Sequence, residues 1–154
     1  MINVKFSRRH VLSTASAALL MTALGPFESA AQAAEVTVYK SPTCGCCVAW
    51  VDHLRDNGFS VIVQEHDDLG PIKMLLGVPD ALQACHSATV GGYVIEGHVP
   101  ARDIRRLLDE QPRGIGLAVA GMPMGSPGME LGGEPDPYQV ILFGAEGDRI
   151  FNAY

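Results

Sequence analysis

The sequence is poor in positive charge. Of its 154 residues, 11 are Lys or Arg and 17 are Asp or Glu, which gives a formal net charge of −6. Such a chain has no electrostatic attraction for nucleic acid or for an anionic membrane surface, and attracts cations weakly. A Ser-His-Asp arrangement, a phosphate loop and a paired-carboxylate motif are also lacking. The sequence therefore gives no support to the common hydrolytic and nucleotide-binding chemistries.

Long apolar runs are equally scarce. The one candidate, residues 11–24, is too short to span a bilayer. It follows Lys5, Arg8 and Arg9 and precedes the small-x-small site Ala31-Gln32-Ala33, a pattern that predicts an export signal over residues 1–33, cleaved after about Ala33. The segment 7–12 resembles a twin-arginine motif, and the alternative is an ordinary secretory signal. We expect a periplasmic protein with no membrane span in its mature form.

Removal of the signal would leave 154 − 33 = 121 residues, enough for one domain with a real core. The signal holds three basic residues and one acidic residue, so 8 basic residues remain against 16 acidic ones and the formal charge becomes −8. Exported cysteines meet an oxidising compartment, where paired thiols are usually disulfides.

Hydrophobic periodicity predicts an α/β fold. A helix at about 44–57, with Val48, Val51 and Leu54 on its apolar stripe, connects two strands that should be parallel neighbours. Gly91-Gly92 predicts the turn of a β-hairpin. The order βαβ then ββα is typical of a thioredoxin-like domain, predicted here over residues 34–113. Its predicted elements are strands at 35–40 and 59–64, short helical segments at 71–76 and 79–84, hairpin strands at 89–90 and 93–95, and a helix at 100–110.

The texture of the chain changes from Gly114 onward. Residues 121–137 are rich in Gly and Pro and carry Met, which predicts an irregular loop. Strands are expected at 138–143 and 149–154, forming a C-terminal β-hairpin. We therefore expect residues 114–154 to be an extension that packs on the same domain.

The chemistry is concentrated in cysteine. Cys44, Cys46 and Cys47 lie within four residues, and Cys85 is the fourth cysteine. Cys44 and Cys47 have the C-x-x-C spacing of thiol redox enzymes, whereas Cys44 and Cys46 have the C-x-C spacing of metal chelators. Their position at a helix N-terminus should favour thiolates, which serve both as nucleophiles and as metal ligands.

Cys85 decides between the two chemistries. It precedes the third predicted strand, where thioredoxin-like domains normally carry a cis proline that shields the sulfurs. The segment 85–89 has no proline. By analogy with those domains, Cys85 therefore offers a metal ligand where a shielding proline would otherwise lie. Four thiolates suit Cu(I), Zn(II) or an iron–sulfur cluster. Crowding favours Cu(I), because it accepts low coordination and bridging thiolates, and several ions could share the four sulfurs.

Weaker candidate ligands lie nearby. Met122, Met124 and Met129 offer thioethers, which favour Cu(I), although packing of the loop is the alternative role for them. His86 adjoins Cys85 and could ligate a metal or orient a ligand. We expect His98 to be a capping or core histidine.

Together these residues resemble the CopG-like family of periplasmic copper-resistance proteins, long described as a domain of unknown function. The resemblance rests on the segments 39–47, 85–86, 91–100 and 121–129. It implies a thioredoxin-like fold and copper bound by Cys44, Cys46, Cys47 and Cys85.

Three functions remain open. The first is a periplasmic copper-binding protein for copper resistance or homeostasis, with copper ions and other periplasmic copper-handling proteins as partners and with redox activity as an extension of that role. The second is a thiol–disulfide oxidoreductase in which Cys44 attacks and Cys47 resolves, so that these would be its catalytic residues. The third is a secreted domain held by two structural disulfides.

Overall fold

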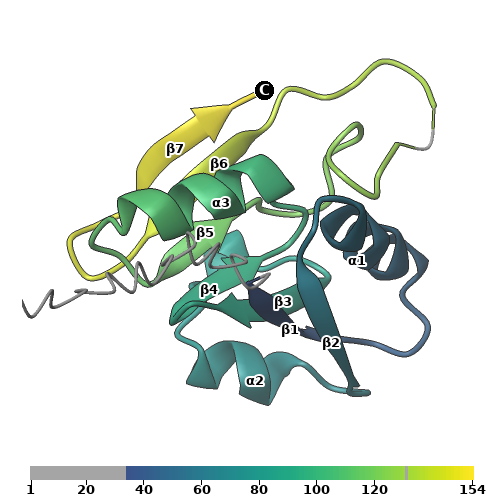
Figure 1. The fold of residues 1–154 in the computed structure, drawn as a ribbon, viewed down its shortest axis with the longest axis horizontal. Helices are drawn as coiled ribbons and strands as arrows, with labels where there is room; N and C mark the ends of the chain where they lie inside the picture. The colour runs from purple at the N-terminus through teal and green to yellow at the C-terminus, as the bar shows by residue number, and fades with distance from the viewer. Residues whose placement is uncertain (1–33, 131) are drawn as a thin grey trace, which may run out of the picture. The chain divides into compact units, whose positions relative to one another are not determined.

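The computed structural model describes residues 34–130 and 132–154, which form a mixed α/β fold with one seven-stranded sheet (Figure 1). The predicted export signal, residues 1–33, lies outside the described residues. In chain order the elements are β1 (Glu35–Lys40), α1 (Gly45–Asp56), β2 (Ser60–Glu65), α2 (Gly70–Leu75), a 3₁₀ turn (Asp80–Leu82), β3 (His86–Val90), β4 (Tyr93–Glu96), α3 (Ala101–Glu110), β5 (Gly116–Ala118), β6 (Gln139–Phe143) and β7 (Arg149–Ala153).

The sheet order is β2-β1-β3-β4-β5-β6-β7. β1 and β2 are parallel neighbours connected through α1, which confirms the predicted crossover. β3 and β4 form the predicted antiparallel hairpin. Its turn residues Gly91 and Gly92 have φ values of 55° and 86°, a left-handed conformation that glycine adopts without steric cost.

β5 was not predicted from the sequence. This three-residue strand pairs in parallel with β4 and antiparallel with β6, so it joins the predicted C-terminal hairpin, β6 and β7, to the rest of the sheet. A Cβ on Gly116 would lie 1.8 Å from the Val94 carbonyl oxygen. The strand therefore needs glycine at a close backbone approach, and such a short segment containing glycine has no recognisable strand pattern.

The main core lies between one face of the sheet and helices α1 and α3. Trp50, Val51 and Leu54 of α1 are buried there with Ile104 and Leu107 of α3. A smaller cluster on the opposite face packs the segment after α2 against the sheet; its buried members are Val78, Val94, Ala118 and Phe143.

The prediction that Val48 lies on the buried face of α1 is wrong. Val48 is 46% exposed, whereas Cys47 is fully buried, so the buried stripe runs through residues 47, 50, 51 and 54. This is the i, i+3, i+4, i+7 pattern of an amphipathic helix, and the cysteine supplies its first apolar position. Within the described ranges, no helix is both long and apolar enough to cross a membrane.

Candidate functional site

The topology of the sheet brings the two groups of cysteines together. β1 and β3 are antiparallel neighbours, and Lys40 at the end of β1 pairs with His86 at the start of β3. The chain that leaves β1 and the chain that enters β3 therefore meet at the same end of the sheet. The first of these segments turns directly into α1 with Cys44 at its N-cap, and the second presents Cys85 one residue before β3.

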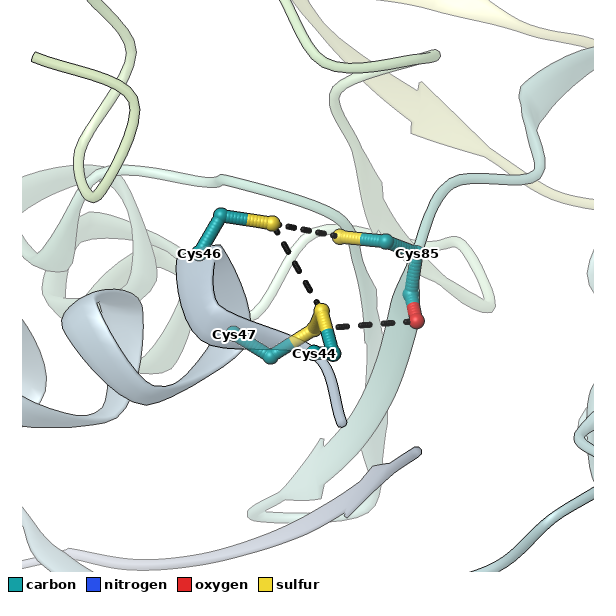
Figure 2. Close-up of side chains that lie close together, drawn as sticks. All are labelled: Cys44, Cys46, Cys47 and Cys85. Carbon is teal, nitrogen blue, oxygen red and sulfur yellow. Dashed lines mark hydrogen bonds between the residues drawn. A yellow bond between two sulfur atoms is a disulfide. The ribbon is translucent and has the colours of Figure 1, made fainter. Parts of the chain in front are cut away.

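The four cysteine sulfurs converge at this end of the sheet (Figure 2). All four Sγ atoms lie within 4.8 Å of one another. The Cys46 Sγ is 3.5 Å from the Cys44 Sγ and 3.8 Å from the Cys85 Sγ, and the Cys47 Sγ is 3.8 Å from the Cys85 carbonyl oxygen. The sequence-based expectation that Cys85 faces the cysteines of the first helical turn agrees with this geometry.

The sulfurs differ in oxidation state. Cys44 and Cys47 form a disulfide with a Cα–Cα distance of 5.4 Å, and Cys46 and Cys85 are free thiols. The hypothesis of two structural disulfides predicts no free thiol, and this structure has two. Reduction of the disulfide would provide four thiols in one place.

The first turn of α1 holds three of the sulfurs at a helix N-terminus. No side chain caps this helix end, so the unpaired backbone N–H groups and the helix dipole favour negative charge there. Cys47 is fully buried, whereas Cys44 and Cys46 are half-buried. The site is therefore open to solvent on the side of Cys44 and Cys46.

Cys85 is a different kind of thiol. Burial, together with the neighbouring Cys46, raises the pKa of Cys85 to about 12. The metal-free protein therefore keeps this thiol protonated at neutral pH. A soft metal ion would displace that proton, so metal binding at Cys85 would release it to solvent.

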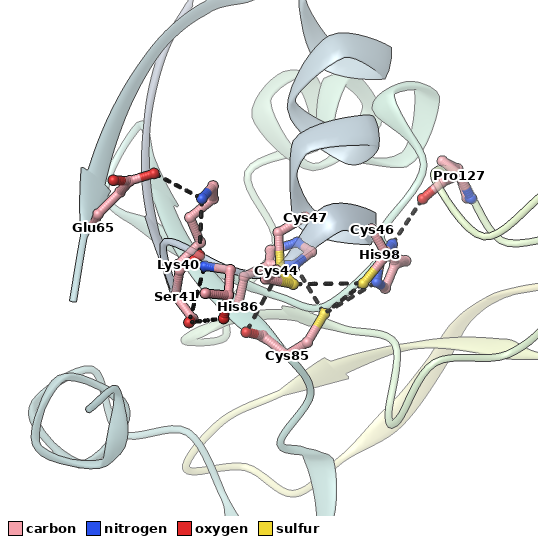
Figure 3. Close-up of a disulfide and its surroundings, with 11 residues drawn as sticks. Lys40, Ser41, Cys44, Cys46, Cys47, Glu65, Cys85, His86, His98 and Pro127 are labelled. Atoms are coloured by element: carbon pink, nitrogen blue, oxygen red, sulfur yellow. Dashed lines mark hydrogen bonds and ion pairs between the residues drawn. A yellow bond between two sulfur atoms is a disulfide. The ribbon is translucent and has the colours of Figure 1, made fainter. Parts of the chain in front are cut away.

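His98, which was expected to be a capping or core histidine, is fully buried and also contacts the cysteine site. Its Nε2 is 3.1 Å from the Cys85 Sγ, and its Nδ1 is 2.8 Å from the Pro127 carbonyl oxygen (Figure 3). A carbonyl only accepts hydrogen bonds, so Nδ1 carries the hydrogen and, in the neutral ring, Nε2 presents its lone pair to the sulfur. Burial lowers the pKa of His98, which favours the neutral ring.

The pairing of β3 with β4 is the signal that would have predicted the position of His98 beside Cys85. β4 is antiparallel to β3, and Glu96, its last residue, pairs with Ser87 near the start of β3. A residue two positions beyond the end of β4 therefore lies beside the start of β3, which is where Cys85 enters.

His86 is fully buried next to Cys85. Its Nδ1 is 3.3 Å from the Cys85 Sγ, and its ring lies 4.3 Å from that of Trp50 and 5.0 Å from that of His98. Burial lowers the pKa of His86 well below its usual value, so the ring is neutral. Within the described residues, its Nε2 is buried without a hydrogen-bond partner. Cys85, His86 and His98 thus form a second close group of metal-ligating atom types.

A buried ion pair supports the chain at Cys85. The Glu96 carboxylate accepts hydrogen bonds from Lys73 Nζ at 2.5 Å, from Ser87 Oγ at 2.5 Å and from the backbone N–H of Ala84 at 2.6 Å. These partners come from α2, from β3 and from the residue before Cys85. One fully buried carboxylate therefore fixes the approach of Cys85 to the sheet.

The Gly/Pro/Met-rich loop contacts both His98 and helix α1. Pro127 holds His98, and Gly128 lies so close to α1 that a Cβ there would be 2.7 Å from the Trp50 backbone nitrogen and 2.9 Å from the Cys46 carbonyl oxygen. Of the three methionines, Met122 is 54% exposed, and Met124 and Met129 are half-buried. Ligation by these thioethers stays a prediction.

These features define a mixed α/β protein with a four-cysteine cluster, flanked by two buried histidines, at one end of its sheet. Two solved structures are similar to it. One, named "Copper resistance protein copG- Form 2", is 40% identical, with a TM-score of 0.75 over 79% of this chain and 98% of that one. The other, "Copper resistance protein copG- Form 1", is 41% identical, with a TM-score of 0.74 over 78% and 96%.

The chain belongs to the CopG-like family, as the sequence resemblance indicated. The family model described as "Protein of unknown function, DUF411" matches residues 82–129, which include Cys85, both site histidines and Pro127, the loop residue that contacts His98. No curated protein matches the sequence. The relatives and the cysteine cluster together indicate a copper-related function.

Proposed function

We propose that this protein binds Cu(I) through the thiolates of Cys44, Cys46, Cys47 and Cys85. The observation that carries the proposal is the convergence of the four Sγ atoms within 4.8 Å of one another. Thiolates are soft ligands that select Cu(I), and three of them come from a single helical turn. Bridging between ions relieves this crowding, so the protein holds more than one copper ion, as a multinuclear cluster.

Loading of four thiolates requires prior reduction of the Cys44–Cys47 disulfide by two electrons. The oxidised protein offers two thiols and the reduced protein offers four. The number of copper ions that the protein can hold therefore depends on the oxidation state of its cysteines. This dependence is the redox activity that we propose for the site.

The histidines complete the proposed site. The Nε2 lone pair of His98 faces the same sulfur that the metal would take, and the Pro127 carbonyl holds the ring in that orientation. His86 is buried against Trp50, and its Nδ1 contacts the Cys85 Sγ. Met122, Met124 and Met129 are auxiliary thioether ligands in this proposal.

An anaerobic titration with Cu(I) against a chromophoric competitor tests the proposal. Fully reduced protein should take up more than one ion per chain, and Cys85→Ser should lower that number. Met74→Leu is the matched control, because it removes an exposed sulfur on α2 that belongs neither to the four-cysteine group nor to the methionine-containing loop. An unchanged copper number in Cys85→Ser would contradict the four-thiolate site. Metal content and free thiols counted on protein taken from the periplasm extend the test to the native state.

The cellular setting is part of the proposal. Residues 34–113 form a thioredoxin-like domain, supported by the order βαβ then ββα and by the parallel pair β1 and β2, and residues 114–154 are its extension. The two relatives named as copper resistance proteins support a role in copper resistance. The export pattern supports a periplasmic location, where other copper-handling proteins would be partners. Replacement of Arg8 and Arg9 by Lys should stop export if the twin-arginine route is used.

The Cys44–Cys47 disulfide favours a second candidate function, a thiol–disulfide oxidoreductase. Cys44 is the more exposed of the two and would attack a substrate, and the buried Cys47 would resolve the mixed disulfide. This function predicts turnover of a dithiol substrate by metal-free protein and a mixed disulfide trapped by Cys47→Ser. Absence of both, with copper uptake intact, would leave copper binding as the function.

A further inference from the structure

The two pairs of cysteines are in contact through one residue. Cys44 and Cys47 are joined as a disulfide, and Cys46 and Cys85 are thiols. The Cys46 Sγ lies 3.5 Å from the Cys44 Sγ and 3.8 Å from the Cys85 Sγ, so it is near both an oxidised sulfur and another thiol (Figure 2). These are van der Waals separations, which place the sulfurs within reach of thiol–disulfide exchange.

We propose that Cys46 relays the disulfide between the two pairs, so that the oxidised protein interconverts between a Cys44–Cys47 form and a Cys46–Cys85 form. This activity goes beyond copper binding and requires no metal. It also differs from oxidoreductase activity on an external substrate, because both the attacking and the attacked sulfurs belong to this chain.

The exchange has two steps. In the first, the Cys46 thiolate forms a bond to the Cys44 Sγ, the Cys44–Cys47 bond breaks, and its electron pair leaves on Cys47. In the second, the His98 Nε2, which is 3.1 Å from the Cys85 Sγ, takes the Cys85 proton as this sulfur forms a bond to the Cys46 Sγ, the Cys44–Cys46 bond breaks, and its electron pair leaves on Cys44. The protons released by Cys46 and Cys85 are taken up by Cys47 and Cys44. One disulfide and two thiols are present before and after, so no oxidant or reductant is consumed.

The placement of each sulfur suits its step. Cys47 lies in the first turn of α1, where the helix N-terminus stabilises a departing thiolate. Cys46 and Cys85 come from α1 and from the entrance to β3, and their sulfurs already face each other. A bond between them needs an approach of the sulfurs to about 2.05 Å. Both residues are half-buried, which leaves their side chains room to move.

The relay changes which sulfurs are free. One form leaves Cys46 and Cys85 as thiols, and the other leaves the C-x-x-C pair Cys44 and Cys47. A protein with a single disulfide therefore always retains two thiols at the site, and it can present either pair to a soft metal or to a partner's disulfide.

Disulfide mapping of metal-free, full-length protein tests the relay. Reduced protein receives one equivalent of diamide, a two-electron thiol oxidant, and samples taken over time are quenched in acid, blocked with N-ethylmaleimide and digested with trypsin. Cys44, Cys46 and Cys47 fall in peptide 41–55, and Cys85 falls in peptide 74–102. The Cys46–Cys85 form therefore appears as a cross-linked pair of peptides, whereas the Cys44–Cys47 form leaves the two peptides separate.

The wild-type protein should show both forms, and their ratio should become constant with time. Cys46→Ser should lose the cross-linked pair, and Cys85→Ser should lose it while retaining a bond within peptide 41–55. Absence of the cross-linked pair in native wild-type protein would overturn the relay, as would equal cross-linking in Cys46→Ser. If Cys46→Ser fails to fold, Cys46→Ala takes its place. Copper titration reports separately, because failure of the relay leaves copper uptake by reduced protein unchanged.

Discussion

The two sides of the cysteine site are held in different ways. On the helix side, Cys44, Cys46 and Cys47 are neighbours in sequence, and a single turn of α1 places them. On the sheet side, Cys85 and His98 come from separate strand ends. Glu96 holds Ala84, the residue before Cys85, and the Pro127 carbonyl holds His98. The helix side depends on local geometry, whereas the sheet side depends on tertiary structure. Substitutions away from the sulfurs should therefore damage the sheet side first.

The largest expected effect comes from the buried ion pair. Glu96→Ala leaves the Lys73 ammonium buried without its partner and removes the acceptor of the Ala84 N–H, so the free energy of unfolding should fall by about 3–5 kcal/mol. Urea denaturation of metal-free protein measures this loss. Glu110→Ala, which removes the exposed ion pair with Arg106, is the matched control and should cost about 0.3–0.5 kcal/mol. Equal losses in the two variants would show that Glu96 has no special role on the sheet side.

Removal of an imidazole on the sheet side should weaken copper binding without unfolding the protein. His98→Gln retains a polar side chain but removes the Nε2 lone pair that faces Cys85, and Cu(I) affinity should fall by about tenfold to a hundredfold. Competition with a Cu(I) chelator measures the affinity, and the melting temperature of the metal-free protein serves as the control. Unchanged affinity would place His98 outside the copper site.

Gly128 tests the contact of the loop with the helix side. Gly128→Ala would place a Cβ 2.7 Å from the Trp50 backbone nitrogen at a φ of +85°, so the loop must shift, at a cost of about 1–3 kcal/mol. Gly121→Ala is the matched control, since its φ is +69° and its Cβ would meet no atom within 4 Å. The difference in unfolding free energy between the two variants isolates the close approach. Equal effects would mean that backbone conformation alone requires glycine at residue 128.

The smallest expected effect concerns pH and the junction of α1 with α3. His53 Nε2 accepts a hydrogen bond from the Ala101 N–H, and burial lowers the pKa of His53 in the folded protein. Below about pH 6.5 the unfolded chain therefore binds more protons than the folded one, and stability falls as pH falls. His53→Gln should reduce the loss of stability between pH 7 and pH 5, as measured by urea denaturation. His86 and His98, whose pKa values are also lowered, contribute to the slope that remains.

The same contrast explains what the sequence could predict. The strands β1 and β2 and the helix between them follow from local patterns, and their bounds lie within one residue of the expected ones. The Gly91-Gly92 turn also lies where it was expected, but β3 begins at His86, three residues before the predicted strand. The cysteine turn was evident for the same reason. The position of Cys85 opposite that turn followed from the likeness to thioredoxin-like domains, in which the segment entering the third strand faces the C-x-x-C turn.

The features that were missed depend on contacts that no local pattern encodes. His98 was assigned to a cap or to the core because a single histidine after a hairpin has no distinctive spacing. Lys73 and Glu96 gave no sign of pairing, since they lie 23 residues apart on a short helix and a strand end. The apolar pattern of the helix predicted a buried Val48, but the buried position belongs to Cys47, whose thiol packs as an apolar side chain.

The three-residue strand β5 has a practical consequence for anyone who divides this protein. It is the only strand between β4 and β6 in the described sheet. A truncation at residue 113 would expose the backbone N–H and C=O groups of β4, a strand otherwise covered on both sides, as a new sheet edge. The shortened protein would be prone to pair edge to edge with further copies of itself, so its aggregation could be mistaken for a loss of copper chemistry.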